Sequence, residues 1–239
     1  LADVDEIDLQ QLVPPGSRAV IVAPHPDDEV LGCGGLLQLL SRAGNPLLLI
    51  SVTDGDASHP GSQRWPVARL IETRPQESAE ALRRLRIDAA GLPWIRAGLP
   101  DSAVAHHEER LQALMARELR ADDVVFATWR EDGHCDHEAV GRAAAAAAKS
   151  VGARLVEIPI WAWHWAGPED PRLPWSRARK LGFDAALLER KRHAMQAHSS
   201  QLEGDPDIQL PPVLDAHALE RLLRPFEVFF VSAQESESA

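Results

Sequence analysis

Residues 19–29 read Ala-Val-Ile-Val-Ala-Pro-His-Pro-Asp-Asp-Glu, an apolar run followed at once by a polar turn. The run is short, rich in β-branched residues and apolar at every position, as in a parallel strand buried on both faces. A helical pattern follows over residues 30–43. Because ligands of parallel sheets collect beyond the carboxyl ends of the strands, the polar turn is a candidate functional site.

The alternation of apolar runs and helical patterns continues along the chain. Further apolar runs cover residues 47–52, 124–127 and 155–160, and a last one covers 226–231. Helical patterns cover residues 30–43, 75–86, 108–120, 137–151 and 184–198. We expect Pro75 in the first turn of its helix, with Thr73 and Gln76 as a capping box. The alternation predicts an α/β sandwich with a mostly parallel sheet.

Length and composition favour one ordinary globular domain. The chain has 239 residues and a net charge of −11, which disfavours binding to nucleic acid. There is no long apolar run for a transmembrane segment and no pattern of a signal peptide, so we expect a cytoplasmic protein. We predict a single domain over residues 1–239, with an extended N-terminal segment at 1–15 and a frayed tail at 234–239.

Two polar motifs after predicted strands carry the chemistry. The first is Pro-His-Pro-Asp-Asp-Glu at 24–29, and the second is His-Cys-Asp-His at 134–137. Two histidines and one carboxylate form a common catalytic zinc set that leaves one position open for water. We therefore predict that His25, Asp28 and His137 bind Zn²⁺, although another divalent transition metal such as Fe²⁺ is compatible with these ligands.

The remaining polar residues of the two motifs suit proton transfer. Asp27 lies next to the predicted ligands and can act as the general base on a metal-bound water. His134, as a cation, can stabilise an oxyanion and then protonate a leaving amine. Asp136 can hold His134 in orientation and favour its charged form. These roles predict hydrolysis of an amide.

Other interpretations remain open at this point. The acidic residues at 27–29 also suit a helix N-terminus, and the second motif also suits a surface turn. The glycine-rich stretch 30–35 resembles a loop of S-adenosylmethionine-dependent transferases, but it does not follow the strand directly. A non-catalytic sugar-binding module is the third alternative.

The two motifs together resemble the LmbE-like, or PIG-L, family of zinc-dependent deacetylases. The resemblance implies a Rossmann-like three-layer fold and removal of an acetyl group from an N-acetylated amino sugar or related amide. It implies the same ligands and proton-transfer residues as above, and a small N-acetylated sugar or glycoconjugate as substrate. Pro24 and Cys135 depart from the family pattern, and Cys135 raises the question whether its thiolate enters the metal shell.

Softer matches concern substrate contacts. The resemblance implies that Arg74 and Asp101 contact the substrate, and Lys191 with residues 198–201 matches a further family pattern. Trp129 follows a predicted strand close to His134, so we expect it beside the substrate. A tryptophan-rich stretch over residues 161–175 can either line a sugar site or close the edge of the sheet.

Overall fold

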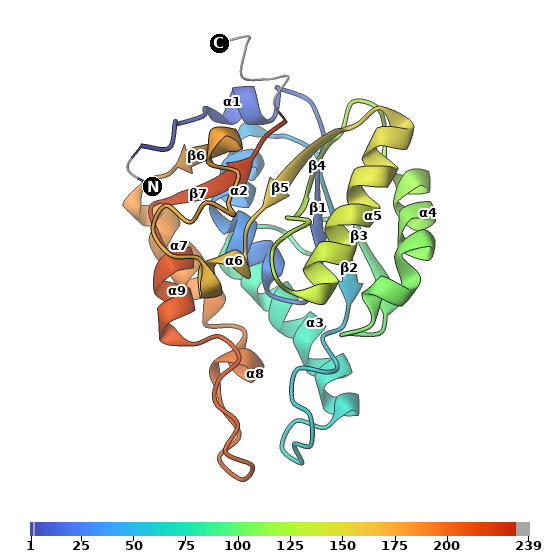
Figure 1. Ribbon diagram of the computed structural model, residues 1–239, viewed down its shortest axis with the longest axis vertical. Coiled ribbons are helices and arrows are strands. Elements are labelled where there is room, and N and C mark those ends of the chain that lie inside the picture. Colours follow the sequence, from blue (N-terminus) through green and yellow to red (C-terminus); the bar gives the residue numbers. More distant parts are fainter. Residues whose placement is uncertain (2, 233–239) are drawn as a thin grey trace.

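The computed structural model describes residue 1 and residues 3–232. A single sheet of seven strands forms its centre, in the order β3-β2-β1-β4-β5-β7-β6 (Figure 1). The strands are β1 (Ala19–Ala23), β2 (Leu47–Thr53), β3 (Trp94–Leu99), β4 (Val124–Thr128), β5 (Arg154–Ile158), β6 (Ala178–Gly182) and β7 (Phe226–Phe230). Neighbouring strands from β3 to β5 are parallel, whereas β7 is antiparallel to both β5 and β6. The predicted α/β sandwich with a mostly parallel sheet is confirmed.

Helices cover both faces of the sheet. The longer ones are α2 (Asp28–Ala43), α3 (Val67–Arg84), α4 (Glu108–Glu118), α5 (Cys135–Val151) and α7 (Ala185–Met195). The shorter ones are α1 (Leu9–Leu12), α6 (Ala162–Trp165), α8 (Ser199–Leu202), α9 (Ala216–Leu222), η1 (Val104–His107) and η2 (Trp175–Arg177). Helices α4 and α5 cover one face, and α2, α3 and α7 cover the other (Figure 1).

Strand β1 shows why the sequence adopts this layered arrangement. Its five residues are all buried, with Ile21 in the core beneath α2 and Val22 in the core beneath α5. Successive side chains of a strand point to opposite faces, so an uninterrupted apolar run fits a strand between two helical layers. The alanine-rich segment of α5 brings that helix close to the sheet, with Ala144 and Ala147 fully buried.

Two predicted boundaries are wrong. Helix α3 begins at Val67, so Pro75 lies inside the helix and not in its first turn. The N-terminal segment, predicted to be extended over 1–15, contains the one-turn helix α1, whose Leu12 is fully buried. The predicted frayed tail at 234–239 lies outside the described residues. Among the described residues, no helix is both long and apolar enough to cross a membrane.

The strand order creates a crevice at the carboxyl ends of β1 and β4. The chain moves from β1 through β2 to β3 on one side, and from β4 to β5 on the other. Such a reversal of strand order is where open α/β sheets bind their ligands. Because β1 pairs directly with β4, the segments that follow these two strands meet at this crevice.

Candidate active site

The segment after β1 supplies His25 and Asp28. Asp28 is the first residue of α2, and its Oδ2 accepts a hydrogen bond of 2.9 Å from the backbone N–H of His25. The same oxygen lies 3.3 Å from Nδ1 of the His25 ring. Both side chains are almost completely buried. The turn between strand and helix therefore directs one imidazole nitrogen and one carboxylate oxygen to the same point.

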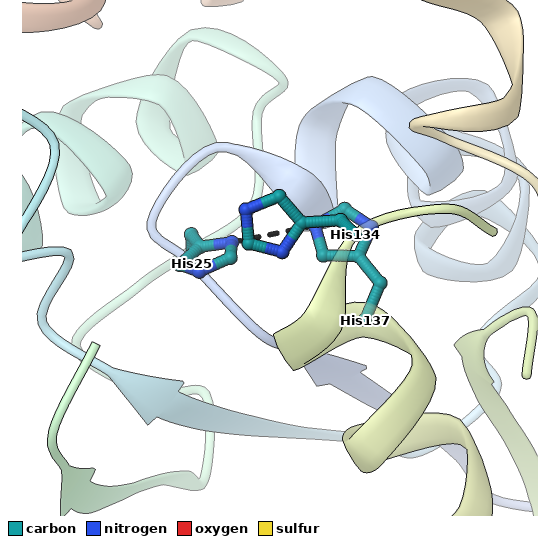
Figure 2. Close-up of side chains that lie close together, drawn as sticks. All are labelled: His25, His134 and His137. Carbon is teal, nitrogen blue, oxygen red and sulfur yellow. Dashed lines mark hydrogen bonds between the residues drawn. The ribbon is translucent and has the colours of Figure 1, made fainter. Parts of the chain in front are cut away.

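The segment after β4 supplies His134 and His137 at the start of α5. His134 is the N-cap residue of this helix, and His137 lies in its first turn. Figure 2 shows the imidazoles of His25, His134 and His137 gathered at this end of α5, with a dashed line joining His25 and His137. The structure thus brings together the two motifs that the sequence separates.

Three donor atoms form a nearly equilateral triangle. Nδ1 of His25 is 3.3 Å from Nε2 of His137 and 3.3 Å from Oδ2 of Asp28, and Nε2 of His137 is 3.4 Å from that oxygen. In a tetrahedral zinc site with bonds of about 2.0–2.1 Å, any two ligand atoms are about 3.3–3.4 Å apart. The residues therefore fit a divalent ion bound by two imidazoles and one carboxylate.

The opposite nitrogens of both histidines face carboxylates. Nδ1 of His137 is 2.7 Å from Oδ2 of Asp132, and Nε2 of His25 is 3.2 Å from Oδ2 of Asp136 and 3.3 Å from Oδ1 of Asp101. Ionised carboxylates only accept hydrogen bonds, so these outer ring nitrogens carry protons, and the inner nitrogens present lone pairs to the triangle when the rings are neutral. Carboxylates commonly orient metal-binding histidines in this way.

A second group of possible ligands lies on the far side of the His25 ring. It comprises His25, Asp101 and Asp136. The Asp136 carboxylate already accepts hydrogen bonds from the backbone N–H groups of Ser102 and Val104, and that of Asp101 accepts one from Ala57. These carboxylates thus already accept hydrogen bonds, whereas the other group of possible ligands, His25, His134 and His137, includes two corners of the triangle.

The ionisable groups of the triangle shift each other's pKa. Burial lowers the pKa of His137, but Asp28 and Asp132 outweigh it and raise this pKa to about 9. Burial also lowers the pKa of His25, but Asp101, Asp136 and Asp28 hold it well above the usual value. For Asp28, the two histidines outweigh burial and keep the pKa well below the usual value. Without a metal, protons hold this cluster together, so metal binding must release them.

Asp27 lies beside the triangle in an unusual backbone conformation. Its φ of 138° falls in a region that non-glycine residues rarely adopt, which indicates local strain. Arg74 stabilises the turn, because Nη2 donates to the carbonyl oxygen of Pro26 and lies 3.2 Å from Oδ2 of Asp27. Gly55 permits this approach, since a Cβ there would lie 1.9 Å from the guanidinium. Burial raises the pKa of Asp27 to about 8, although Arg74 opposes the shift.

His134 differs from the sequence-based expectation in its charge and its partner. Its Nδ1 accepts a hydrogen bond from the backbone N–H of Asp136, so the ring is neutral and carries its proton on Nε2. Burial, followed by the positive charges of His137 and His25, lowers its pKa to about 4. The Asp136 carboxylate contacts His25 and not the His134 ring. The prediction that the Asp136 carboxylate orients His134 is therefore wrong in this structure.

An open cavity of about 210 Å³ adjoins the triangle. All three predicted ligands line it, together with Asp27, Arg74, Asp101 and His134. Trp161 and His164 form part of its wall, with their rings stacked at a centroid distance of 4.2 Å. The tryptophan-rich stretch thus contributes one indole to the cavity.

Trp129 does not lie where we expected it. It is only 3% exposed and packs edge-to-face on Phe230 in a separate apolar cluster. Trp129 follows the end of β4 and does not line the cavity. Sequence reasoning had assigned the substrate contact to Trp129, whereas the structure places Trp161 at that wall. The alternation of tryptophans from 161 to 165 was the signal for this, but it did not distinguish one indole from the others.

The positions of Cys135 and of the glycine-rich stretch answer two further questions that the sequence raises. Cys135 is exposed, and its Sγ lies 3.8 Å from Oδ1 of Asp136, outside the triangle. The glycines of the glycine-rich stretch lie within α2, where Gly32 packs against Ile158 and Gly35 against Phe183. They serve helix packing, so the structure contains no loop there for a nucleotide-like cofactor.

Comparisons with known proteins concern the family and the fold of this chain. Residues 20–148, just over half of the chain, match the family model described as PIG-L: GlcNAc-PI de-N-acetylase. Over 137 residues the chain is 29% identical to 2'-N-acetylparomamine deacetylase of Streptomyces fradiae, which covers 50% of this chain and 48% of that protein. The chain thus spans about half the length of this curated relative.

Two solved structures show the same fold over nearly the whole chain. One is an N,N'-diacetylchitobiose deacetylase from Pyrococcus horikoshii, with a TM-score of 0.67 and 20% identity over 95% of this chain and 87% of that one. The other is a deacetylase of the teicoplanin biosynthetic pathway, with a TM-score of 0.65 and 22% identity over 90% and 97%. Because the family model spans both polar motifs and the fold agrees, the chain belongs to the PIG-L family.

Proposed function

We propose that this protein is a zinc-dependent hydrolase that removes the acetyl group from an N-acetylated amino sugar or a related amide. The observation that carries the proposal is the triangle of His25, Asp28 and His137 donor atoms, with Asp27 buried beside it at the end of an open cavity. Family membership and the printed activity of the Streptomyces fradiae relative support the same reaction.

The triangle supports a divalent transition metal as the cofactor. Two imidazoles and one carboxylate suit Zn²⁺, and Fe²⁺ is compatible with the same donors. When bound, such an ion acts as a Lewis acid toward water and toward the carbonyl oxygen of the amide.

Asp27 transfers the proton in this proposal. Its buried carboxylate lines the cavity beside the triangle, which suits a group that first accepts and then donates a proton. The carboxylate takes one proton from the attacking water as the new C–O bond forms at the carbonyl carbon. It returns this proton to the amide nitrogen as the C–N bond breaks, which leaves a free amine and acetic acid, and the acid then loses its proton to solvent to give acetate. Arg74 holds the carboxylate in place during both steps.

His134 stabilises the developing charge. Its neutral ring presents an Nε2–H group, since Nδ1 is occupied by the backbone of Asp136. This N–H can donate to the amide oxygen while negative charge builds up on it. Asp136 acts through His25 as a positioning residue, because its carboxylate contacts that ring and not the cavity wall at His134.

The cavity favours a sugar-sized substrate with one apolar wall. Trp161 offers an indole surface of the kind that packs on sugar rings, and Arg74 and Asp101 line the cavity near the triangle. Both charged side chains already have protein partners, so we assign them to support Asp27 and His25 first and to contact the substrate second.

The test is acetate release by metal-reconstituted protein. The chain is stripped with a chelator, reloaded with Zn²⁺ or Fe²⁺, and incubated with N-acetylglucosamine, N,N'-diacetylchitobiose and an N-acetylated aminocyclitol glycoside. We expect equal amounts of acetate and free amine from at least one compound, only in the reloaded samples. Binding of these sugars without turnover by fully loaded protein would instead favour a non-catalytic sugar-binding module and would contradict the proposal.

A further inference from the structure

Asp132 is a fully buried carboxylate with four hydrogen-bond donors around it. Its Oδ2 lies 2.7 Å from Nδ1 of His137 and 2.7 Å from the backbone nitrogen of Trp161. Its Oδ1 accepts from the backbone N–H groups of Ile160 at 3.0 Å and Ala162 at 2.9 Å. Four donors fill the hydrogen-bonding capacity of an ionised carboxylate. Through Oδ2 the carboxylate connects two parts of the structure, and through Oδ1 it accepts two further hydrogen bonds from one of them.

The two parts are a metal ligand and a wall of the cavity. His137 belongs to α5, whereas residues 160–162 lead into α6 and include its N-cap, Trp161. Trp161 and His164 line the cavity. The backbone of Asp132 adds a further connection, because its carbonyl oxygen accepts a hydrogen bond of 2.8 Å from Nε1 of Trp165. Gly133 allows this approach, since it has a φ of +90° and a Cβ there would lie 2.5 Å from Nε1 of Trp165.

We propose that Asp132 is a positioning residue that couples the metal site to the Trp161 wall of the substrate cavity. It fixes the His137 tautomer with the proton on Nδ1, which leaves Nε2 free for the metal. The same carboxylate accepts hydrogen bonds from the backbone N–H groups of Trp161 and Ala162. These hydrogen bonds fix the backbone that carries the Trp161 indole. This inference rests on the metal site of the proposed function, but not on the chemistry that follows.

The substitution Asp132→Asn separates this role from a general contribution to stability. An asparagine has one acceptor oxygen and one donating amide, so no orientation of its side chain can satisfy all four donors. We expect its affinity for Zn²⁺ to fall about 10–100-fold, as for other lost partners of metal-binding histidines. We also expect the Trp161 wall to move, and this effect is measurable in the metal-free protein.

Two matched variants serve as controls. Asp136→Asn removes the partner of the other ligand histidine, but Asp136 has no hydrogen bond to residues 160–162 among the described contacts. It should weaken Zn²⁺ binding and leave the Trp161 wall unchanged. Asp123→Asn removes a buried carboxylate that pairs with Arg18 at the other end of β4. It should reduce stability and leave both the metal affinity and the wall unchanged.

The experiment measures Zn²⁺ affinity by chelator competition, and Trp161 emission as the difference between each variant and the same variant carrying Trp161→Phe. We expect Asp132→Asn to change both quantities, Asp136→Asn to change only the affinity, and Asp123→Asn to change neither. When reloaded with saturating Zn²⁺, Asp132→Asn should retain a raised KM, whereas Asp123→Asn, whose carboxylate pairs with Arg18, should show the wild-type KM. An Asp132→Asn protein that alters only the affinity, or neither quantity, overturns the proposed coupling.

A measurement on the unaltered chain covers the case in which Asp132→Asn does not fold. With ¹⁵N-labelled histidine in the Zn²⁺-loaded wild-type protein, the His137 ring should show a protonated Nδ1 and a metal-bound Nε2. A His137 ring protonated on Nε2 contradicts the role of Asp132. Zn²⁺ binding without acetate release would count against the proposed function alone, because the affinity, the emission and the tautomer do not depend on turnover.

Discussion

Nδ1 of His25 lies 3.3 Å from Nε2 of His137, although the two residues are 112 positions apart in the chain. The histidines use different ring nitrogens because they enter the site from different elements, one from the turn after β1 and one from the first turn of α5. Each opposite nitrogen faces a buried carboxylate. The pairing of β1 with β4 is therefore the feature of the fold on which the site depends.

Replacing Asp27 tests the proton-transfer step. In Asp27→Asn the side chain can no longer accept a proton from water, so we expect kcat for acetate release to fall about 10²–10⁴-fold. The metal content should remain that of the wild type, since Asp27 is not one of the three donors. Asp54→Asn is the control, because Asp54 pairs with Arg96 and does not line the cavity. Wild-type kcat in Asp27→Asn would remove this residue from the mechanism.

A pair of tryptophan substitutions tests which indole contacts the substrate: Trp129, as predicted from the sequence, or Trp161, which lines the cavity. Trp161→Phe should raise KM by about tenfold or less with little change in unfolding free energy, since Trp161 contacts the cavity. Trp129→Phe should lower the unfolding free energy by about 1–3 kcal/mol and leave KM unchanged, because it leaves a gap against Phe230. Steady-state kinetics and urea unfolding of both variants decide the matter. The opposite pattern would return the substrate contact to Trp129.

His198 should make the protein sensitive to acid. Burial, and then the positive charge of Arg74, lowers its pKa to about 3 in the folded chain. In the unfolded chain the ring has a pKa of about 6.5, so between these values the unfolded state binds one proton more and stability falls as the pH falls. Between about pH 7 and about pH 5, this histidine should account for about 2 kcal/mol of lost unfolding free energy.

The measurement is urea unfolding of His198→Gln at both pH values. The loss of unfolding free energy on acidification should be smaller in this variant than in the wild type by the amount above. His106→Gln, in which an exposed histidine is replaced, is the control for the substitution itself. An identical pH dependence in wild type and His198→Gln would show that His198 does not stay neutral in the folded chain.

The buried ion pair of Lys191 and Glu227 should support the helix that carries Asp28. Nζ of Lys191 donates to Glu227 and to the carbonyl oxygen of Leu31, and Glu227 accepts from the backbone N–H groups of Gly35 and Leu36 in α2. Glu227→Gln leaves the lysine charge buried without a counter-charge, so we expect a loss of about 3–5 kcal/mol in unfolding free energy.

The double variant Lys191→Met/Glu227→Gln provides the comparison. It removes both charges, so it should be more stable than Glu227→Gln alone. Thermal or urea unfolding of the three proteins measures the difference. If the single variant were as stable as the wild type, the ion pair would not be a structural support of α2.

Much of the fold could be predicted because the central strands are apolar on both faces. The runs at 19–23, 47–52 and 124–127 coincide closely with β1, β2 and β4. Strand β3 was missed because Leu99 is its only buried residue, and β6 because it is a charged edge strand. The predicted start of α3 is wrong because proline is expected in the first turn of a helix, whereas Pro75 lies in the interior of α3.

The sequence predicts those parts of the site that directly follow the end of a strand. That rule placed His25, Asp28 and His137 together, because parallel strands end at the same edge. It could not assign Asp136 and Asp132 to their histidines, since those contacts depend on how the first turn of α5 meets β1 and α6. It also misplaced Trp129, because closeness in sequence to His134 does not determine the face of the sheet to which a side chain points.

The most direct test of the account is a crystal structure of the Zn²⁺-reconstituted protein with anomalous diffraction data at the zinc edge. We predict one anomalous peak per chain, about 2.0–2.2 Å from Nδ1 of His25, Oδ2 of Asp28 and Nε2 of His137. A peak bound by His134 or by Asp101 and Asp136, or no peak within reach of the His25 and His137 rings, would contradict the metal site and the hydrolase built on it.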